Sequence, residues 1–219
     1  TTRLVGSEMC IRDRSPMDLF HVDLKKTVDH SYDIVIGSGL EDRLQEDLDV
    51  LARSDGRSIA VITDSNVYAH YGAELESRLK SALPELKINT AVFPAGEKSK
   101  TRETKAYLED LLISWGYRRD TLILAFGGGV VTDLAGFVAG TFARGVPFVN
   151  YATTLLAAAD ASIGGKTAVD TDAATNLIGL IYQPKRVYID IAMWKTLSQR
   201  ELSDGLAETI KHACMADAA

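Results

Sequence analysis

The central stretch of this chain reads TLILAFGGGVVTDLAG and covers residues 121–136. Its first six residues are typical of a buried β-strand, three glycines follow, and the remainder is typical of a helix. A strand that passes through glycines into a helix leaves bare backbone amides at the helix N-terminus. These amides and the helix dipole attract phosphate, and glycine lets a ligand approach the backbone closely. The stretch therefore predicts a nucleotide site.

Strands and helices alternate on both sides of this stretch. Such alternation predicts an α/β fold, a Rossmann-like parallel sheet with helices on both faces. Strands are predicted at residues 19–28, 32–36, 58–63, 86–93, 121–126, 147–151 and 186–191, the first two as a pair at a sheet edge. Helices are predicted at residues 40–52, 71–83, 101–115, 130–144, 153–160 and 198–215.

Composition excludes several classes of protein. The 219 residues are 46% hydrophobic, which is enough for a substantial core, and no apolar run reaches the length of about 20 residues that a membrane span needs. The net charge of −6 argues against nucleic-acid binding but leaves anionic small substrates open. Cys10 and Cys214 are too few for a disulfide framework, so we expect a reducing, cytoplasmic location.

Three segments divide the sequence. Residues 1–16 show neither helical nor strand periodicity, and we interpret them as a leader foreign to the protein. Residues 17–197 are predicted to form the nucleotide-binding α/β domain. Residues 198–219 are predicted to contain a helix that the end of the chain truncates, and the resemblance described below implies that this helix begins an α-helical domain.

Polar residues follow two of the predicted strands. Asp64 comes directly after the strand at residues 58–63, where it could accept hydrogen bonds from ribose hydroxyls or serve as a helix N-cap. The sequence favours neither alternative. Thr153 and Thr154 likewise suit either an N-cap or a contact to phosphate. We interpret the glycines of residues 37–39 as an ordinary strand-to-helix turn.

Charged residues mark three further turns or helix ends. The turn at residues 94–100 follows another strand end, which favours a place beside the site. Asp160 ends an almost wholly apolar helix and is either buried with a partner or faces a cleft, because unpaired burial is costly. The glycines at residues 164–165 predict a flexible approach to Lys166, whose ammonium can bind an anion.

The last predicted helix carries an acid and two basic residues. Glu208, Lys211 and His212 have spacings of three and four residues and therefore share one helix face. Taken alone, these residues favour a surface ladder of ion pairs over a binding site.

Seven short runs together resemble one known family. They are FGGGVVTDLAGF (126–137), RGV (144–146), TTLL (153–156), DASIGGKT (160–167), NLIG (176–179), YQPK (182–185) and GLAETIK (205–211). In this order they resemble the 3-dehydroquinate synthases, members of the sugar-phosphate cyclases. The resemblance covers the chain from about residue 32 to its end.

The resemblance implies an enzyme of the shikimate pathway that works as a homodimer with NAD and a divalent metal, zinc or cobalt. Its substrate would be a small phosphorylated sugar acid, 3-deoxy-D-arabino-heptulosonate 7-phosphate, converted to 3-dehydroquinate and phosphate. The implied NAD contacts are Asp64, Asn66, Glu97, Lys100, Gly129, Val130, Asp133, Thr153, Thr154, Lys166 and Thr196. The implied substrate-pocket residues are Arg144, Asp160, Lys166, Asn176 and Lys211, and the implied metal ligand is Glu208.

Other functions remain open at this stage. Thr175 stands where the family usually has Lys, which favours a related cyclase acting on another sugar phosphate as the main alternative. A metal-dependent polyol dehydrogenase and a non-catalytic NAD-binding module are further alternatives. The chain lacks the two His ligands that would complete a metal site of this family, so we expect the 219 residues by themselves to be inactive.

Overall fold

The structure is a computed structural model that describes residues 23, 27–53 and 58–216. The main folded unit begins at Ser31, and the described residues before it form neither helix nor strand. The predicted leader, residues 1–16, lies outside the described residues. The strands are β1 (Asp33–Gly37), β2 (Ser58–Asp64), β3 (Ile88–Phe93), β4 (Thr121–Gly127), β5 (Phe148–Ala152), β6 (Lys166–Thr171), β7 (Ala174–Ile181) and β8 (Arg186–Asp190).

The helices alternate with these strands as predicted. The longer ones are α1 (Glu41–Arg53), α3 (Ala73–Ala82), α4 (Arg102–Ser114), α5 (Gly129–Thr141) and α6 (Gln199–Ala216). The shorter elements are α2 (Ser65–Val67), η1 (Tyr68–Gly72), η2 (Glu97–Ser99), η3 (Phe142–Arg144), η4 (Ala157–Ala161) and η5 (Ile191–Thr196). The helix predicted from residue 71 begins earlier, at Ser65, because α2 and η1 lead directly into α3.

Six of the described strands form one parallel sheet in the order β1-β8-β5-β4-β2-β3. The predicted edge pair of residues 19–28 with 32–36 lies largely outside the described residues, because only residues 23, 27 and 28 of its first run are described. The described residues 27–28 lie outside any strand. The second run forms β1, which pairs in parallel with β8 at the edge of the sheet.

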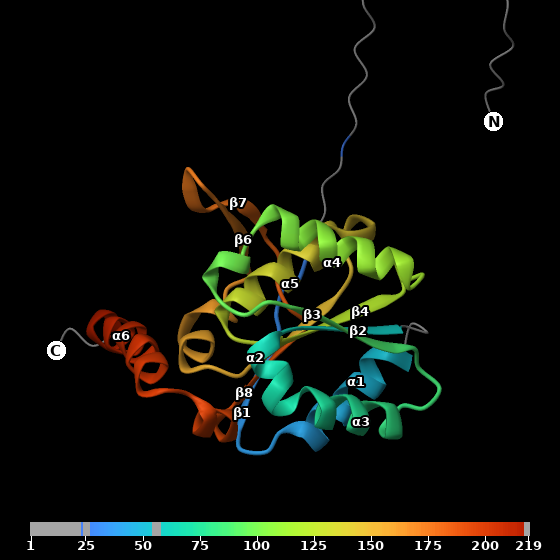
Figure 1. Ribbon diagram of the computed structural model, residues 1–219, viewed down its shortest axis with the longest axis horizontal. Helices are drawn as coiled ribbons and strands as arrows, with labels where there is room; N and C mark the ends of the chain where they lie inside the picture. Colours follow the sequence, from blue (N-terminus) through green and yellow to red (C-terminus); the bar gives the residue numbers. More distant parts are fainter. Residues whose placement is uncertain (1–22, 24–26, 54–57, 217–219) are drawn as a thin grey trace, which may run out of the picture. The chain divides into compact units, whose positions relative to one another are not determined.

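Helices cover both faces of this sheet, as predicted, and each face has its own apolar core. Figure 1 shows α4 and α5 on one side of the strands and α1 and α3 on the other. The buried residues that the helices contribute are Leu108 and Leu112 of α4, Leu134 and Val138 of α5, Leu44 and Leu48 of α1, and Leu75 and Leu79 of α3. The spacing of four residues within each pair is the helical periodicity on which the prediction relied.

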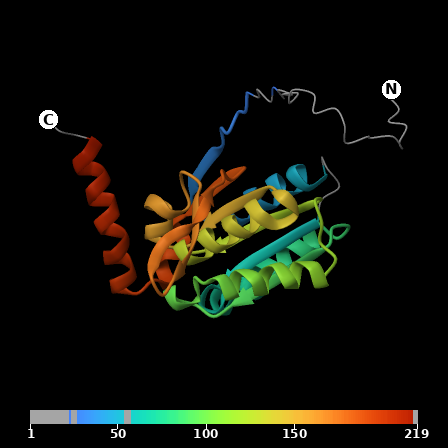
Figure 2. The same ribbon diagram turned by 90° about the horizontal axis from the view of Figure 1, so that it is seen from above.

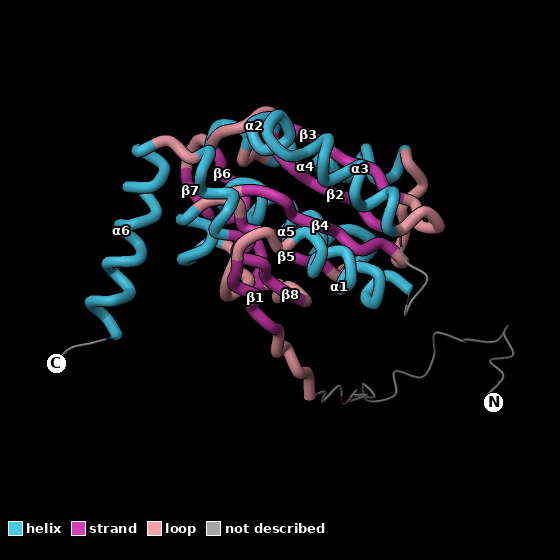
Figure 3. The backbone as a smooth tube through the Cα atoms, turned by 90° about the horizontal axis from the view of Figure 1, so that it is seen from below, coloured by secondary structure: helices cyan, strands magenta, loops and turns pink. Residues whose placement is uncertain are grey.

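An antiparallel hairpin of β6 and β7, which the sequence analysis did not predict, packs against α5 (Figure 3). Gly136 of α5 makes the close approach possible, because a Cβ atom there would lie 2.5 Å from Cγ2 of Thr167. Within the hairpin, a Cβ atom at Gly179 of β7 would lie 1.9 Å from the Thr167 carbonyl oxygen, so this glycine lets the two strands approach each other. The hairpin thereby places residues 166 and 176 next to the helix that follows the glycine turn.

The last helix, α6, was predicted from sequence and is observed. Figure 2 shows it extending away from the sheet. It contacts η4. Its residue Gly205 is buried, and a Cβ atom there would lie 2.6 Å from Cβ of Leu155, just before η4. Leu206, Ile210 and Met215 are exposed. No helix in the described ranges is long and apolar enough to cross a bilayer.

A buried carboxylate fixes the turn at residues 37–39. Asp190, at the end of β8, accepts hydrogen bonds from the backbone amides of Gly39, Leu40 and Ala192 and from the Tyr151 hydroxyl, at 2.6–3.0 Å. Burial alone would raise the pKa of Asp190, but these hydrogen bonds outweigh burial and lower it. The segment is an ordinary strand-to-helix turn, as interpreted from the sequence.

We expect Asp190→Ala to lower the free energy of unfolding by about 3 kcal/mol, because it leaves a buried tyrosine hydroxyl and several amides without an acceptor. The contribution of the ionised carboxylate is complete above its unfolded pKa of about 3.9 and is lost as pH falls through the lower folded pKa. Urea unfolding at pH 7 and pH 3 measures both effects. Asp49→Ala, which breaks an exposed pair with Arg53, is the control; an equal loss in both variants would contradict the assignment.

Candidate nucleotide and anion site

The carboxyl ends of β2 and β4 adjoin at the point where the chain reverses its direction across the sheet. β3 lies beside β2 on one side, and the chain then returns to place β4 on the other side. Ligands of open α/β sheets bind at such a switch point, outside the carboxyl ends of the strands. Asp64 ends β2 and Gly127 ends β4, so the predicted acid and the glycine turn flank the same crevice.

Asp64 is the N-cap of α2, one of its two predicted alternatives. Its Oδ1 accepts hydrogen bonds from the amides of Asn66 at 2.8 Å and Val67 at 2.9 Å. Both contacts use the same oxygen, so Oδ2 can accept a hydrogen bond from a ligand. Asn66 is exposed beside it. A ribose contact therefore remains compatible with the capping role and stays a prediction.

The glycine turn is closely packed against the segment that follows β5. A Cβ atom at Gly128 would lie 3.0 Å from Cγ2 of Thr154, and one at Gly129 would lie 3.2 Å from Cβ of Ala161. Thr154 Oγ1 accepts the amide hydrogen of Ala157, which is the N-cap alternative. The start of α5 has no side-chain cap, so its first amides, including that of Val130, are not used by a capping side chain.

Thr153 differs from Thr154. Its side chain is buried, 3% exposed, and its Oγ1 has no hydrogen-bond partner among the described residues. A buried hydroxyl without a partner is costly, so a polar ligand atom at this point would satisfy it. This orphaned hydroxyl lies directly after β5, the strand next to β4.

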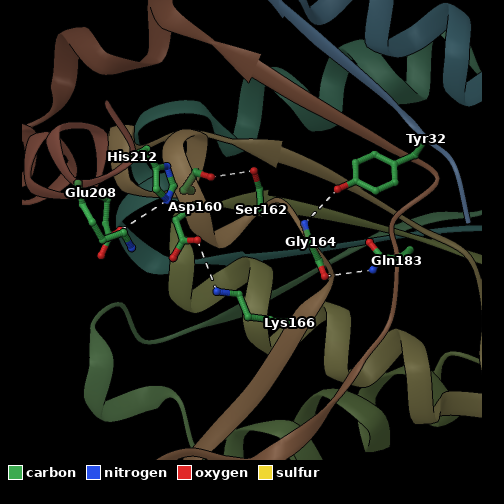
Figure 4. Close-up of polar contacts among 10 residues, drawn as sticks. Tyr32, Asp160, Ser162, Gly164, Lys166, Gln183, Glu208 and His212 are labelled. Carbon is green, nitrogen blue, oxygen red and sulfur yellow. Dashed lines mark hydrogen bonds and ion pairs between the residues drawn. The ribbon is translucent and has the colours of Figure 1, made fainter. Parts of the chain in front are cut away.

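Four of the predicted site residues line one cavity of about 540 Å³. Asp133 comes from α5, Asp160 from η4, Lys166 from β6 and Asn176 from β7. The Lys166 ammonium lies 3.5 Å from Asp160 Oδ1 (Figure 4). The sequence analysis expected Asp160 either to have a partner or to face a cleft. In the structure it does both, because it lines the cavity and pairs with Lys166.

The side chain of Lys100 connects a predicted cofactor residue, Asp133, with a predicted substrate residue, Asn176. Its buried ammonium lies 2.6 Å from Asp133 Oδ2, 2.6 Å from Asn176 Oδ1 and 3.6 Å from Glu97 Oε1. Burial alone would lower the pKa of Lys100, but the hydrogen bond and charge of Asp133 raise it. Burial raises the pKa of Asp133, and the ion pair offsets only part of that effect. The lysine thus fixes Asn176 at the wall of the cavity.

Asp170 supports the same asparagine, and the sequence analysis missed it. The Asn176 backbone has a φ of +56°, a left-handed conformation, and its amide donates to Asp170 Oδ1 at 2.8 Å. The register of the hairpin shifts between Val169 and Thr171, around Asp170. Such a bulge re-aims a side chain. Only the strand pairing reveals the role of Asp170, because the sequence gives no local signal at this position.

Arg144, Thr196 and Lys211 are among the predicted residues that do not line the cavity. Arg144 is exposed and precedes β5, so it lies toward the amino ends of the strands, whereas the crevice is at their carboxyl ends. It is not among the cavity-lining residues, and its place in the substrate pocket stays a prediction. Thr196 follows β8, and its hydroxyl lies 2.8 Å from that of Tyr71.

The sequence predicted a flexible approach to Lys166, but in the structure hydrogen bonds hold the two glycines before it. Gly164 donates its amide hydrogen to the Tyr32 hydroxyl, and its carbonyl accepts from Gln183 (Figure 4). The Gly165 carbonyl accepts the amide hydrogen of Tyr182 at 2.8 Å. Contacts from distant segments therefore hold both glycines, which the glycine content alone could not indicate.

The charged face of α6 forms the predicted ladder of ion pairs. Glu208 pairs with Lys211 and lies 3.9 Å from His212. The hydrogen bond that Lys211 donates to Glu208 raises the pKa of Lys211, and the nearby charge of Asp160 adds to this effect. Within the described ranges no three His, Cys, Asp or Glu residues gather as metal ligands. These residues alone do not fit a metal site, although Glu208 remains the predicted ligand.

A parallel sheet with a glycine turn at its switch point and a polar cavity beside that turn defines a Rossmann-like α/β domain. The sequence pattern of the 3-dehydroquinate synthase N-terminal family matches residues 90–204, and the chain belongs to this family.

Similar proteins agree with this membership. The chain is 43% identical over 201 residues to the 3-dehydroquinate synthase of Thermoanaerobacter pseudethanolicus, covering 92% of this chain and 54% of that protein. ValA, a 2-epi-5-epi-valiolone synthase from Streptomyces hygroscopicus solved with NAD+ and Zn2+, has a TM-score of 0.71 at 32% identity over 86% of this chain and 50% of its own. A 2-deoxy-scyllo-inosose synthase solved with carbaglucose-6-phosphate, NAD+ and Co2+ has a TM-score of 0.69 at 29% identity, covering 81% and 48%. The chain thus spans about half the length of each.

We expect Lys100→Met to lower the free energy of unfolding by about 3 kcal/mol, since it leaves the carboxylate of Asp133 buried without its cation. Lys80→Met is the matched control, because Lys80 pairs with Glu76 at the surface and should change stability by less than about 1 kcal/mol. Chemical denaturation of both variants measures the difference. Equal stability of the two variants would show that the buried pair does not hold the site together.

Proposed function

We propose that this chain is the NAD-binding domain of a 3-dehydroquinate synthase, which converts a seven-carbon phosphorylated sugar acid into 3-dehydroquinate and phosphate. The observation that carries the proposal is that Asp133, Asp160, Lys166 and Asn176 line the same cavity beside the glycine turn. The family membership and the 43% identical synthase support it. Because the chain covers about half of that relative, the activity of the whole protein is proposed here.

The crevice between β2 and β4 fits NAD. The amides at the start of α5 suit its pyrophosphate, Asp64 Oδ2 suits a ribose hydroxyl, and the unpartnered Thr153 Oγ1 suits a further polar atom. Bound NAD supplies a reversible oxidation of a substrate alcohol, which acidifies the neighbouring C–H and allows phosphate to leave. The protein supplies the position of that alcohol.

The residues of the cavity suit an anionic, hydroxylated substrate. Lys166 is two-thirds exposed, so its ammonium is available to a phosphate or carboxylate. Asp160 lies beside that ammonium and can accept a hydrogen bond from a substrate hydroxyl. The Asn176 amide is held by Lys100 and can orient a second hydroxyl. Together they bind and orient the ring that reacts.

A related cyclase with another sugar phosphate is the second candidate. Thr175 replaces a cation next to Asn176, and both solved neighbours named above are cyclases for other products. The two candidate functions are separated by assaying the full-length protein for phosphate release from 3-deoxy-D-arabino-heptulosonate 7-phosphate and from glucose 6-phosphate. Turnover of the heptulosonate alone supports the main proposal.

For the cofactor, we expect Asp64→Asn to weaken NAD binding at least about tenfold while leaving stability unchanged. Asn caps a helix as well as Asp, but its amide nitrogen cannot accept the hydrogen bond assigned to Oδ2. Calorimetric titration with NAD measures the affinity, and Asp49→Asn on the exposed face of α1 is the control. If both variants bind NAD equally well, Asp64 is a cap and nothing more.

For the substrate, we expect Lys166→Met in the full-length protein to lose most of kcat/KM for phosphate release. Its exposed side chain contributes little to stability, so the unfolding midpoint should not move. Lys185→Met changes an exposed lysine outside the cavity lining and should retain activity. Wild-type kinetics in Lys166→Met would exclude the anion-binding role.

A further inference from the structure

The backbone of Gly164 is held on both sides by segments that are distant in sequence. Its N–H donates to the Tyr32 hydroxyl at 3.0 Å, and its carbonyl accepts from Gln183 Nε2 at 3.0 Å. Figure 4 shows these two contacts on one flank of the turn, with Lys166 and Asp160 beyond it. Tyr32 precedes β1 and Gln183 follows β7, so the bridge joins three parts of the folded unit.

The turn is also constrained by its own backbone. Gly164 and Gly165 have φ angles of +84° and +69°, which disfavour other residues. A Cβ atom at Gly165 would lie 2.7 Å from Cδ of Gln183, so this side chain packs directly on the second glycine. The two glycines permit the left-handed backbone conformation of the turn, and the side chains packed and hydrogen-bonded against them hold that conformation.

The other end of the turn is anchored in the core. The buried Ser162 donates from Oγ to the Ala157 carbonyl at 2.7 Å, and its own carbonyl accepts from Asn150 Nδ2 at 2.9 Å. The path from Ser162 to β6 is therefore fixed at its start, at Gly164 and at Gly165. Lys166 is the next residue and begins β6 opposite Ile181.

The side chain of Lys166 has no comparable restraint of its own. It is 67% exposed, and its 3.5 Å approach to Asp160 is at the long limit for a hydrogen bond. An exposed pair of this kind contributes little energy. The position of the ammonium at the cavity must therefore come from the backbone that precedes it.

We propose that Tyr32 and Gln183 are positioning residues that hold Lys166 at the cavity through the backbone of Gly164. The proposal rests on the proposed function, in which Lys166 binds the anionic group of the substrate. Gln183 Oε1 is buried without a partner among the described residues, so this side chain adds little net stability. Its hydrogen bond shapes the turn more than it stabilises the fold.

Tyr32→Phe and Tyr182→Phe are a matched pair for the test. Each removes one hydroxyl hydrogen bond to the backbone, but Tyr182 bonds the Val146 carbonyl, away from Gly164. Amide hydrogen exchange in the 219-residue chain should be roughly fivefold faster at Gly164 in Tyr32→Phe and unchanged in Tyr182→Phe. Gln183→Glu, which replaces the donor by an acceptor, should act like Tyr32→Phe.

A double-mutant cycle with Lys166→Met tests the functional part. We expect Tyr32→Phe to weaken binding of inorganic phosphate several-fold in the unchanged chain and to have no effect once Lys166 is removed. Equal effects in both backgrounds would show a merely structural role and overturn the proposal. Equal exchange at Gly164 in the two phenylalanine variants would also overturn it. A chain that binds no phosphate, yet shows the predicted exchange difference, would contradict the proposed function and support the restraint on the turn.

Discussion

The buried ammonium of Lys100 is the interaction on which the site depends. Removing this charge from water costs several kcal/mol, and the cost is offset only where Asp133 and Asn176 both lie 2.6 Å away. These partners belong to α5 and to the β6–β7 hairpin, which also pack together in the core through Val169 and Ile178. A displacement of either element would leave a charge unpaired, so one ion pair fixes the hairpin against the helix that follows the glycine turn.

This constraint explains why the cofactor crevice and the cavity are adjacent. The glycine turn belongs to the sheet, and its place follows from the order of β2 and β4. The cavity belongs to the hairpin, which is not part of that sheet. Lys100 lies between them, directly before α4, and Asp170 of the hairpin donates its amide hydrogen to the Lys100 carbonyl at 2.7 Å. Backbone and side chain of one residue thereby connect the two halves of the site.

The sequence predicted the fold well where the signal is local. Helical spacing of Leu44 and Leu48 and the apolar run of β4 report burial directly, and the parallel sheet follows from their alternation. The hairpin was missed because its pairing depends on contacts with α5 rather than on a pattern within the strands. Asp64 and the glycine turn were predicted because both follow strands. The partners of Lys100 and the support of Asn176 by Asp170 were missed, since they join residues that only the folded chain brings together.

The two lysines of the site show how one residue type can serve opposite purposes. Lys100 is buried and its donors are occupied by protein acceptors, so it organises the site and has little capacity for a ligand. Lys166 is exposed, has one distant partner and begins a strand whose preceding turn is hydrogen-bonded on both sides. A cation that is to bind and release an anion must not be neutralised by the protein, and its position must then come from the backbone. The bridge from Tyr32 through Gly164 to Gln183 meets that requirement without adding a counter-charge at the cavity.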